Sequence, residues 1–320
     1  MTESIEAGPI VSGYRRLRGV AIDGMANFGD FLSARPGLQR RLFFLARRFV
    51  AGETVETAID AVRTLNAAGL SATLDFLGED VHDEGAAALT ADTYVRMIDA
   101  IVAARADANV SVKLSAIGQA ISDDTAVRNL FPILERAKAA NMFVRLDMEG
   151  SKTVNSTYRI LARARAAYEQ VGAVVQAYLH RAQDDVQKLI ADGTRVRLCK
   201  GAYAERPDVA FQDMPAIRRN YMRLAEALLT SGVYHGIATH DDNLIEAVRA
   251  FVERKGIGPD RFEFQMLYGI RPERQREIVG LKYRLRVYVP FGTHWAGYFY
   301  RRLAERKENV YFVVRSLFSR

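Results

Sequence analysis

The sequence predicts an α/β protein, a closed barrel of eight parallel strands with helices around its outside. Eight short segments rich in β-forming residues recur along the 320-residue chain. Their starts are about thirty residues apart, which is the size of one βαβ unit. Between them lie helical patterns with apolar residues at three- and four-residue spacing. The length suits one such barrel with an appended segment, because α/β barrels often reach about 250 residues as a single domain.

The expected strands cover residues 72–77, 110–116, 142–148, 173–179, 195–199, 236–239, 262–267 and 285–289. We expect them to be apolar, since both faces of a parallel strand in such a barrel are buried. The clearest helices cover residues 90–107, 155–172 and 214–232, and each opens near a Thr, Asn or Pro start signal.

The first 70 residues lie outside this alternation and are expected to form a helical arm, with apolar stripes over residues 38–51 and 55–68. The barrel domain is then expected to cover residues 71–320. After the eighth strand, residues 291–318 are typical of one long helix, which we expect to reach over the mouth of the barrel.

Charge and composition exclude several classes of protein. The chain has 45 Lys+Arg and 38 Asp+Glu, a net charge of +7, but residues 49–281 alone carry −4. The excess is confined to the two ends, so we expect no general nucleic-acid-binding surface. A single cysteine, Cys199, excludes an internal disulfide and is compatible with a reducing cytoplasm. No apolar run approaches the ~18–20 residues that span a bilayer, and the N-terminus lacks a secretory signal pattern.

Polar residues gather at the carboxyl ends of the expected strands, where barrel enzymes build their active sites. They are Lys113, Ser115, Asp147, Glu149, Gln176, Tyr178, Arg197, Lys200, Thr239, His240, Asp241, Gln265, Tyr268 and Tyr288. Only eight of the 45 basic residues are Lys, yet two of them stand at this rim. A lysine taken into a barrel mouth binds an anion or acts as a Schiff-base amine, and the residues alone leave both alternatives open.

The last expected helix carries Tyr298, Arg301, Arg302 and Glu305 on one face. Two adjacent guanidinium groups can clamp a carboxylate, and Glu305 can hold the pair in place. The alternative is an ordinary solvated helix face.

Eight motifs in order resemble those of the proline dehydrogenase family: VKLSAIG, RLDMEGS, VVQAYLHR, VRLCKGAYAE, ATHDDN, FEFQMLYGIR, RVYVPFG and YRRLAE. The resemblance extends from about Phe49 to the C-terminus, and the chain length is similar to the monofunctional bacterial form. It implies a distorted barrel that binds FAD non-covalently and oxidises L-proline to 1-pyrroline-5-carboxylate, with a membrane quinone as electron acceptor. No Gly-rich motif after a strand supports a Rossmann dinucleotide domain.

The resemblance also implies roles for individual residues. Asp147 and Arg197 would be catalytic, with Arg197 near the flavin N5. The substrate site would contain Lys113, Tyr203, Leu267, Tyr288, Tyr298, Arg301 and Arg302. Asp147 and Glu305 would balance the charges of Lys113 and the two arginines. Tyr288 occupies the space that a ring hydroxyl would need, so we expect proline to be preferred over 4-hydroxyproline.

The cofactor site implied by the resemblance consists of Met148, Gln176, Arg197, Lys200, Gly201, Ala202, Thr239, His240 and Glu305. Three positions depart from the family pattern: Cys199 stands where Val is usual, Ala204 where a large aromatic is common, and Asp241 where Asn is common. No residue cluster has the spacing of metal ligands, so no metal is expected. His240 and His294 are equally consistent with structural roles.

Two alternatives remain at this stage. A lyase or aldolase with Lys113 or Lys200 as Schiff-base amine would explain the lysines but not Arg197. A non-catalytic basic protein would bind RNA or an anionic membrane through its ends. The arginines of the N-terminal arm (Arg15, Arg16, Arg18, Arg40, Arg41, Arg47 and Arg48) could approach anionic lipid or pack on a second subunit. We expect a cytoplasmic protein able to contact the inner face of the cell membrane.

Overall fold

The computed structural model of the chain describes residues 35–305, which divide into two compact units. One unit is residues 51–292 and holds the barrel. The described part of the other consists of residues 35–50 and 293–305. The expected domain boundary at residue 70 stays a prediction.

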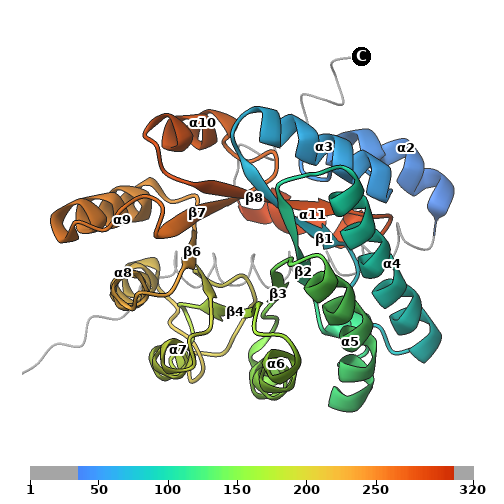
Figure 1. Cartoon of the computed structure of the whole chain (residues 1–320), viewed down its shortest axis with the longest axis horizontal. Coiled ribbons are helices and arrows are strands. Elements are labelled where there is room, and N and C mark those ends of the chain that lie inside the picture. The colour runs from blue at the N-terminus through green and yellow to red at the C-terminus, as the bar shows by residue number, and fades with distance from the viewer. Residues whose placement is uncertain (1–34, 306–320) are drawn as a thin grey trace, which may run out of the picture. The chain divides into compact units, whose positions relative to one another are not determined.

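Eight parallel strands form a closed barrel in sequence order (Figure 1). They are β1 (Ser71–Phe76), β2 (Ala108–Val112), β3 (Val144–Leu146), β4 (Val171–Gln176), β5 (Val196–Cys199), β6 (His235–Ala238), β7 (Phe262–Leu267) and β8 (Leu285–Phe291). Pairing of β8 with β1, from Ser71 opposite Arg286 to Phe76 opposite Phe291, completes the ring. The predicted fold class, an eight-stranded α/β barrel, is therefore confirmed.

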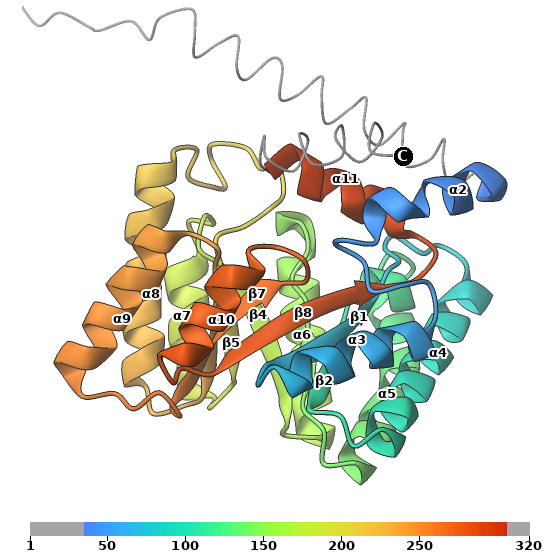
Figure 2. The ribbon, with the colours of Figure 1, turned by 90° about the horizontal axis from the view of Figure 1, so that it is seen from above.

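Seven helices connect the strands and surround them (Figure 2). They are α4 (Glu84–Ala103), α5 (Asp123–Ala139), α6 (Val154–Ala167), α7 (Ala182–Ala191), α8 (Met214–Thr230), α9 (Asp242–Lys255) and α10 (Pro272–Gly280). An eighth helix, α3 (Val55–Ala67), precedes the first strand and packs against β1 and β8. A segment expected in the N-terminal arm thus covers the seam between the first and last strands.

The strands are not apolar throughout, and this expectation was wrong. Contacts between strands that are not neighbours pass through the barrel interior: Arg197 on β5 reaches Ser111 on β2, and Tyr288 on β8 reaches Asp147 after β3. Alternate residues of a strand point to opposite faces. One face therefore packs apolar side chains against the helices, while the inner face carries charged and polar ones.

Glycine makes room for these large interior side chains. A Cβ atom at Gly236 would lie 2.3 Å from Nε2 of Gln265, and one at Gly172 would lie 2.9 Å from Nη1 of Arg145. Both distances are too short for real contacts, so a side chain at either position would displace a polar group of the interior.

Several element boundaries differ from those expected. β2 ends at Val112 because Ser115–Ile117 form a short 3-10 helix, so Lys113 follows the strand directly. The helix expected from residue 90 begins at Glu84, since the Asp83 side chain accepts a hydrogen bond from the Ala86 N–H and caps the helix there.

In the second unit, α2 (Pro36–Ala46) and the residues that follow it pack on α11 (Trp295–Glu305) through aromatic side chains. The rings of Phe43 and Trp295 are 5.8 Å apart, and those of Phe49 and Phe299 are 6.2 Å apart. The first helix ends at Ala46 rather than at residue 51. The last begins at Trp295 rather than at residue 291, because Pro290 and Phe291 still pair with β1. Its expected continuation to residue 318 lies outside the described residues, as does most of the basic arm.

Within residues 35–305, no helix is both long enough and apolar enough to cross a membrane.

Candidate active site

The centre of the barrel mouth is an ion pair between Arg197 and Asp147. Nη1 of Arg197 donates to Oδ1 of Asp147 at 2.7 Å and to Oγ of Ser111 at 3.1 Å. Nε of Arg197 donates to Oε1 of Gln265 at 2.6 Å, and Ser111 Oγ donates to the same Asp147 oxygen at 2.7 Å. Side chains from three other strands or strand ends thus hold one guanidinium in a single orientation.

A second ion pair joins Lys113 to Asp75. Nζ of Lys113 donates to both carboxylate oxygens, at 2.6 Å to Oδ1. Lys113 is 8% exposed and Asp75 is fully buried, so neither charge is solvated. Burial lowers the pKa of Lys113, but the Asp75 and Asp147 carboxylates outweigh burial and leave this pKa raised. Lys113 is therefore held as an ammonium group, which disfavours a Schiff-base nucleophile.

Tyr288 connects the two ion pairs. Its hydroxyl donates to Oδ2 of Asp147 at 2.8 Å and lies 3.4 Å from Nζ of Lys113. Burial, followed by the nearby Asp147 and Asp75 charges, raises the pKa of Tyr288 well above its ordinary value, so the phenol stays protonated. The Arg197 guanidinium lies 5.0 Å from the centre of the Tyr288 ring.

The side-chain amide of Gln176, the last residue of β4, has hydrogen-bond partners for its nitrogen but none for its oxygen. Its Nε2 donates to the backbone oxygens of Met148 and Glu149, at 3.1 and 2.7 Å. Its Oε1 is buried without a hydrogen-bond partner. A buried acceptor without a donor is costly, so it indicates a place for a ligand N–H group.

The rim between β5 and β6 carries a chain of charges. Asp241 accepts from Nζ of Lys200 at 3.3 Å and from Nε of Arg218 at 2.8 Å, and it also caps α9 through the Asn243 N–H. Thr239 Oγ1 accepts from the Asp241 N–H, while Nε2 of His240 accepts from the Leu267 N–H at 2.9 Å. His240 therefore makes a hydrogen bond within the barrel, as expected of a structural histidine.

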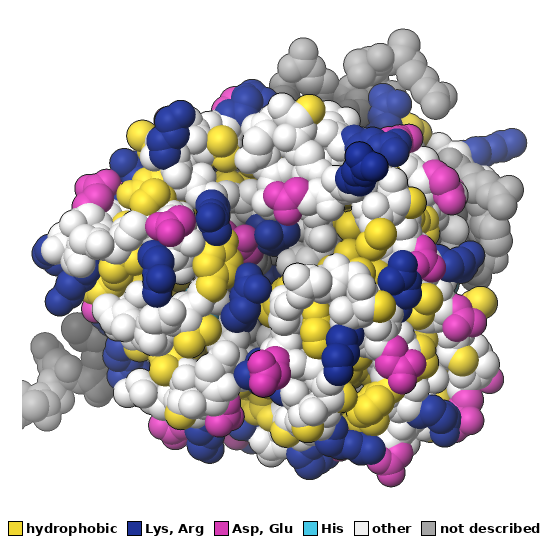
Figure 3. All heavy atoms as spheres, in the orientation of Figure 1, with side chains coloured by type: hydrophobic (Ala, Val, Ile, Leu, Met, Phe, Trp, Pro, Cys, Tyr) yellow, Lys and Arg dark blue, Asp and Glu magenta, His cyan; other side chains and the backbone are white. Residues whose placement is uncertain are grey.

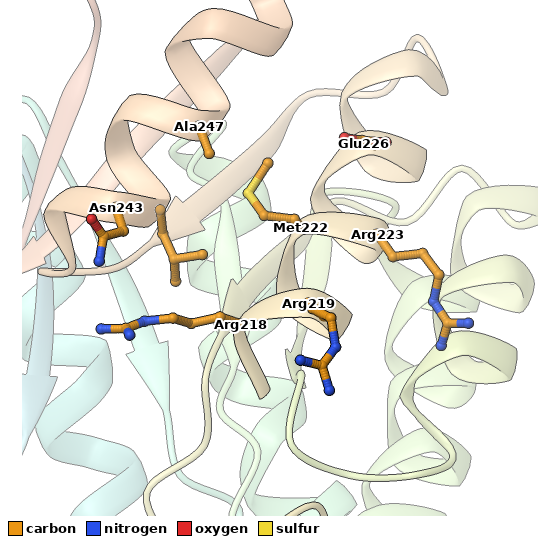
Figure 4. Close-up of a pocket in the computed structure, with 8 residues that line it drawn as sticks. Arg218, Arg219, Met222, Arg223, Glu226, Asn243 and Ala247 are labelled. Atoms are coloured by element: carbon orange, nitrogen blue, oxygen red, sulfur yellow. The ribbon is translucent and has the colours of Figure 1, made fainter. Parts of the chain in front are cut away.

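A surface pocket of about 490 Å³ lies between α8 and α9 (Figure 4). It is lined by Arg218, Arg219, Met222, Arg223, Glu226, Asn243, Leu244 and Ala247. None of the predicted site residues lines this pocket, so it is separate from the candidate active site. Arg218, which lines this pocket, is linked to the rim of the mouth through its hydrogen bond to Asp241.

The remaining predicted residues lie in two places. Tyr203, 37% exposed, and Ala202 lie on the loop between β5 and α8, next to Gly201 with its positive φ of 115°. Tyr298, Arg301 and Arg302 lie on α11, as predicted, and the Arg302 guanidinium is 5.0 Å from the Tyr298 ring centre. The side chain of Glu305 lies outside what the structure describes. That α11 covers the mouth stays a prediction.

Asp75 and Ser111 are site residues that the sequence argument missed. Each lies one residue before the end of its strand, Asp75 on β1 and Ser111 on β2. The available signal was the alternation of polar residues along two strands: Thr73 and Asp75 on β1, then Asn109, Ser111 and Lys113 on β2 and directly after it. No group of three or more His, Cys, Asp or Glu residues within residues 35–305 could hold a metal ion.

Basic and acidic side chains are interspersed on the face of the molecule shown in Figure 3. A nucleic-acid-binding face would instead gather Lys and Arg into one patch.

A parallel α/β barrel with buried, hydrogen-bonded ion pairs at the carboxyl ends of its strands has the construction of a barrel enzyme. The comparisons with known proteins specify which enzyme class this is. Residues 58–315 match the sequence model of the proline dehydrogenase family. The chain is 43% identical over 272 residues to Proline dehydrogenase 1 of Bacillus subtilis subsp. natto, covering 85% of this chain and 90% of that one.

A second relative, Proline dehydrogenase of Deinococcus radiodurans, is 40% identical over 285 residues, covering 87% of this chain and 92% of that one. The chain belongs to the proline dehydrogenase family and is an enzyme of that class. Among solved structures, proline utilization A of Bdellovibrio bacteriovorus, inactivated by N-propargylglycine, superposes with a TM-score of 0.78 at 25% identity. The likeness covers 84% of this chain and only 33% of that longer one.

Membership of this family implies proline as substrate and a flavin cofactor. The residues at the mouth fit a flavin, since Gln176 offers a buried acceptor without a donor and Lys200 offers a cation at the rim. Gln176, Arg197 and Lys200 would hold the group. A bound flavin supplies a two-electron acceptor next to the substrate.

Proposed function

We propose that this enzyme oxidises L-proline to 1-pyrroline-5-carboxylate with FAD as cofactor and passes the electrons to a quinone. The observation that carries the proposal is the joined pair of ion pairs, Lys113–Asp75 and Arg197–Asp147, at the mouth of a family-matched barrel. In metabolic terms this is the first step in converting proline to glutamate.

The substrate carboxylate would be bound by Lys113 together with Arg301 and Arg302 of α11. Lys113 has three N–H donors: Asp75 engages two of them, and the third donates to the Tyr288 hydroxyl over a long 3.4 Å contact that a substrate carboxylate would replace. Asp75 keeps the ammonium charged and fixed in place. The carboxylate clamp would thereby set the distance between the reacting carbon of proline and the electron acceptor.

The proline ring would lie against Tyr288, with Leu267, Tyr203 and Tyr298 completing an apolar wall. Tyr288 cannot rotate away at no cost, because its hydroxyl donates to Asp147. A hydroxyl added to the substrate ring would meet this fixed phenol, so proline should be preferred over 4-hydroxyproline.

Arg197 would act as the fixed positive charge near the position where negative charge develops during the reaction. Its orientation by Asp147, Ser111 and Gln265 precedes substrate binding, so no reorganisation is needed when the charge appears. The reaction would break the C–H bond of the ring carbon next to a neutral amine and form the C=N bond of the product; a bound flavin would supply the acceptor for the hydride, and the amine proton would leave to solvent.

The other cofactor contacts are proposed for Met148, Gly201, Ala202, Thr239, His240 and Glu305. The quinone acceptor and peripheral contact with a membrane are part of the same proposal, and the basic arginines near the N-terminus are the candidates for that contact.

One spectroscopic experiment tests this function. Purified protein reconstituted with FAD should show flavin absorbance that L-proline bleaches and that a soluble quinone restores. Protein that cannot bind FAD, or whose bound flavin is unaffected by L-proline, would overturn the proposal. Trapping of a carbonyl substrate by borohydride would instead support the lyase.

A further inference from the structure

Ser151 and Glu205 join two loops of the barrel mouth that are far apart in sequence. The Ser151 N–H donates to Oε1 of Glu205 and the Ser151 hydroxyl donates to Oε2, both at 2.6 Å. The carboxylate is thus engaged at both oxygens by a single residue. Neither residue was singled out by the sequence, and neither contacts the ion pairs described above.

The two loops follow β3 and β5, and β4 lies between those strands in the barrel. The Ser151–Glu205 contact therefore passes beyond the end of β4, where Gln176 stands. The loop after β3 carries Asp147 and Met148, and the loop after β5 carries Lys200 and Tyr203. The contact ties together two groups of proposed site residues.

The β5–α8 loop, residues 200–213, is anchored at both of its ends. At the start, the Lys200 carbonyl accepts from the Tyr178 N–H at 2.9 Å. Further along, Phe211 N–H donates to the Tyr178 carbonyl at 2.8 Å, and His180 N–H donates to the Val209 carbonyl at 3.0 Å. Two residues after Tyr203, Glu205 anchors the loop through its side chain.

Tyr203 is the exposed aromatic residue of this loop, and it stands two residues before Glu205. A two-residue separation leaves little freedom, since each residue adds at most about 3.6 Å of chain. Fixing the Glu205 carboxylate therefore fixes the range of positions open to the Tyr203 ring.

We propose that Glu205 is a positioning residue: bonded to Ser151, it holds the Tyr203 segment of the β5–α8 loop at the barrel mouth and thereby sets the affinity for the substrate ring. The role of Tyr203 in this inference rests on the proposed function, whereas the Ser151–Glu205 contact is independent of it.

Four variants of the flavin-loaded full-length enzyme test this inference. Glu205→Ala removes both hydrogen bonds, and Ser151→Ala removes the one from the hydroxyl. Glu205→Gln keeps both partners, because its amide oxygen can accept from the Ser151 N–H while its amide nitrogen donates to the hydroxyl. Asp208→Asn is the matched control, since Asp208 lies on the same loop and pairs with Arg206 within it.

Two measurements are needed on each variant: KM and kcat for L-proline, and hydrogen exchange of the amides of residues 201–206. We expect Glu205→Ala to raise KM about tenfold with kcat within twofold of wild type, which corresponds to about 1.4 kcal/mol of lost substrate affinity. Amide exchange over residues 201–206 should accelerate by a similar factor. Ser151→Ala should give a smaller change of the same kind, and Glu205→Gln should restore both readouts.

Three outcomes would overturn the inference: exchange unaltered in Glu205→Ala, faster exchange with KM unchanged, or an equal effect of Asp208→Asn. A lowered melting temperature of Glu205→Ala would identify a folding defect. In that case the KM and amide exchange of Ser151→Ala, which retains the backbone hydrogen bond, test the inference instead. If the wild type is not reduced by proline, the proposed function fails instead, and exchange still reports whether Glu205 holds the loop.

Discussion

Asp75 holds Lys113 through both of its carboxylate oxygens inside the barrel, and neither charge is exposed to bulk water. A buried ammonium group without a carboxylate partner loses its proton, because the charged form is poorly solvated. The Asp75 carboxylate, with a further contribution from Asp147, therefore keeps Lys113 a cation, and a cation is the form that pairs with the carboxylate of an amino acid.

Asp75→Asn should weaken proline binding. Without the carboxylate, burial lowers the pKa of Lys113 and the fraction of charged Lys113 falls as pH rises. We expect KM for proline to increase at least about tenfold at pH 8, corresponding to roughly 1.4 kcal/mol, and to recover in part at pH 6. Steady-state kinetics from pH 6 to 9 measure this effect.

The control for this prediction is Lys113→Met, which should also raise KM but with no recovery at lower pH. Unfolding should become easier in Asp75→Asn, because breaking a buried ion pair costs about 3–5 kcal/mol. A KM that matches wild type across the pH range would show that Asp75 does not control Lys113.

Tyr288→Ser should reduce the preference for proline over 4-hydroxyproline. The substitution removes the ring that fills the space beside the substrate and leaves a small hydroxyl group. We expect the ratio of kcat/KM values for the two substrates to fall about tenfold, the usual effect of reshaping a pocket by a few atoms. Tyr288→Phe is the matched control, since it keeps the ring and loses only the hydroxyl with its bonds to Asp147 and Lys113. An unchanged ratio in Tyr288→Ser would remove this residue from the specificity site.

Arg301→Met should raise KM for proline while the flavin remains bound. Charge-assisted hydrogen bonds contribute roughly 1.5–3 kcal/mol, so an increase of about ten- to a hundredfold is expected. Kinetics combined with the flavin absorbance of the purified variant test the prediction. Arg63→Met, on the exposed face of α3, serves as the control. Loss of flavin colour with normal proline affinity would contradict the proposed carboxylate clamp.

The barrel could be predicted because its evidence is local: each strand and each helix has its own pattern, and eight repeats specify the topology. Lys113, Asp147, Arg197 and Tyr288 could be found as polar residues at or near the end of apolar strands. Asp75 was missed although it lies only one residue before the end of β1, nearer to its strand end than Arg197 or Tyr288. An alternation criterion would have found it, since inner-facing polar residues recur at every second position.

The contacts between loops could not be predicted at all. Ser151 and Glu205 are separated by 54 positions, and their contact depends on the path of two irregular loops rather than on any periodicity. The same limit applies to the beginning of α11. The continuation of β8 through Pro290 and Phe291 depends on pairing with β1 at the opposite end of the barrel sequence.

His235 should make the folded state sensitive to acid. Burial, followed by the Arg145 and Arg195 charges, lowers the pKa of His235 to about 3, and its Nδ1 accepts from the Val196 N–H at 3.0 Å. The unfolded chain binds a proton at this position below about pH 6.5, whereas the folded protein does not until near pH 3. Stability must therefore fall as pH is lowered through that window, by about 2 kcal/mol between pH 7 and pH 5.

His235→Asn should remove this dependence, because the Asn oxygen can accept from Val196 without titrating. Urea unfolding at pH 7 and pH 5 should show that wild type loses about 2 kcal/mol more than the variant over the same interval. His82→Asn, at an exposed position, should keep the wild-type dependence. Since all other titrating groups are shared, equal losses in wild type and His235→Asn would mean that His235 is not the group whose protonation destabilises the barrel.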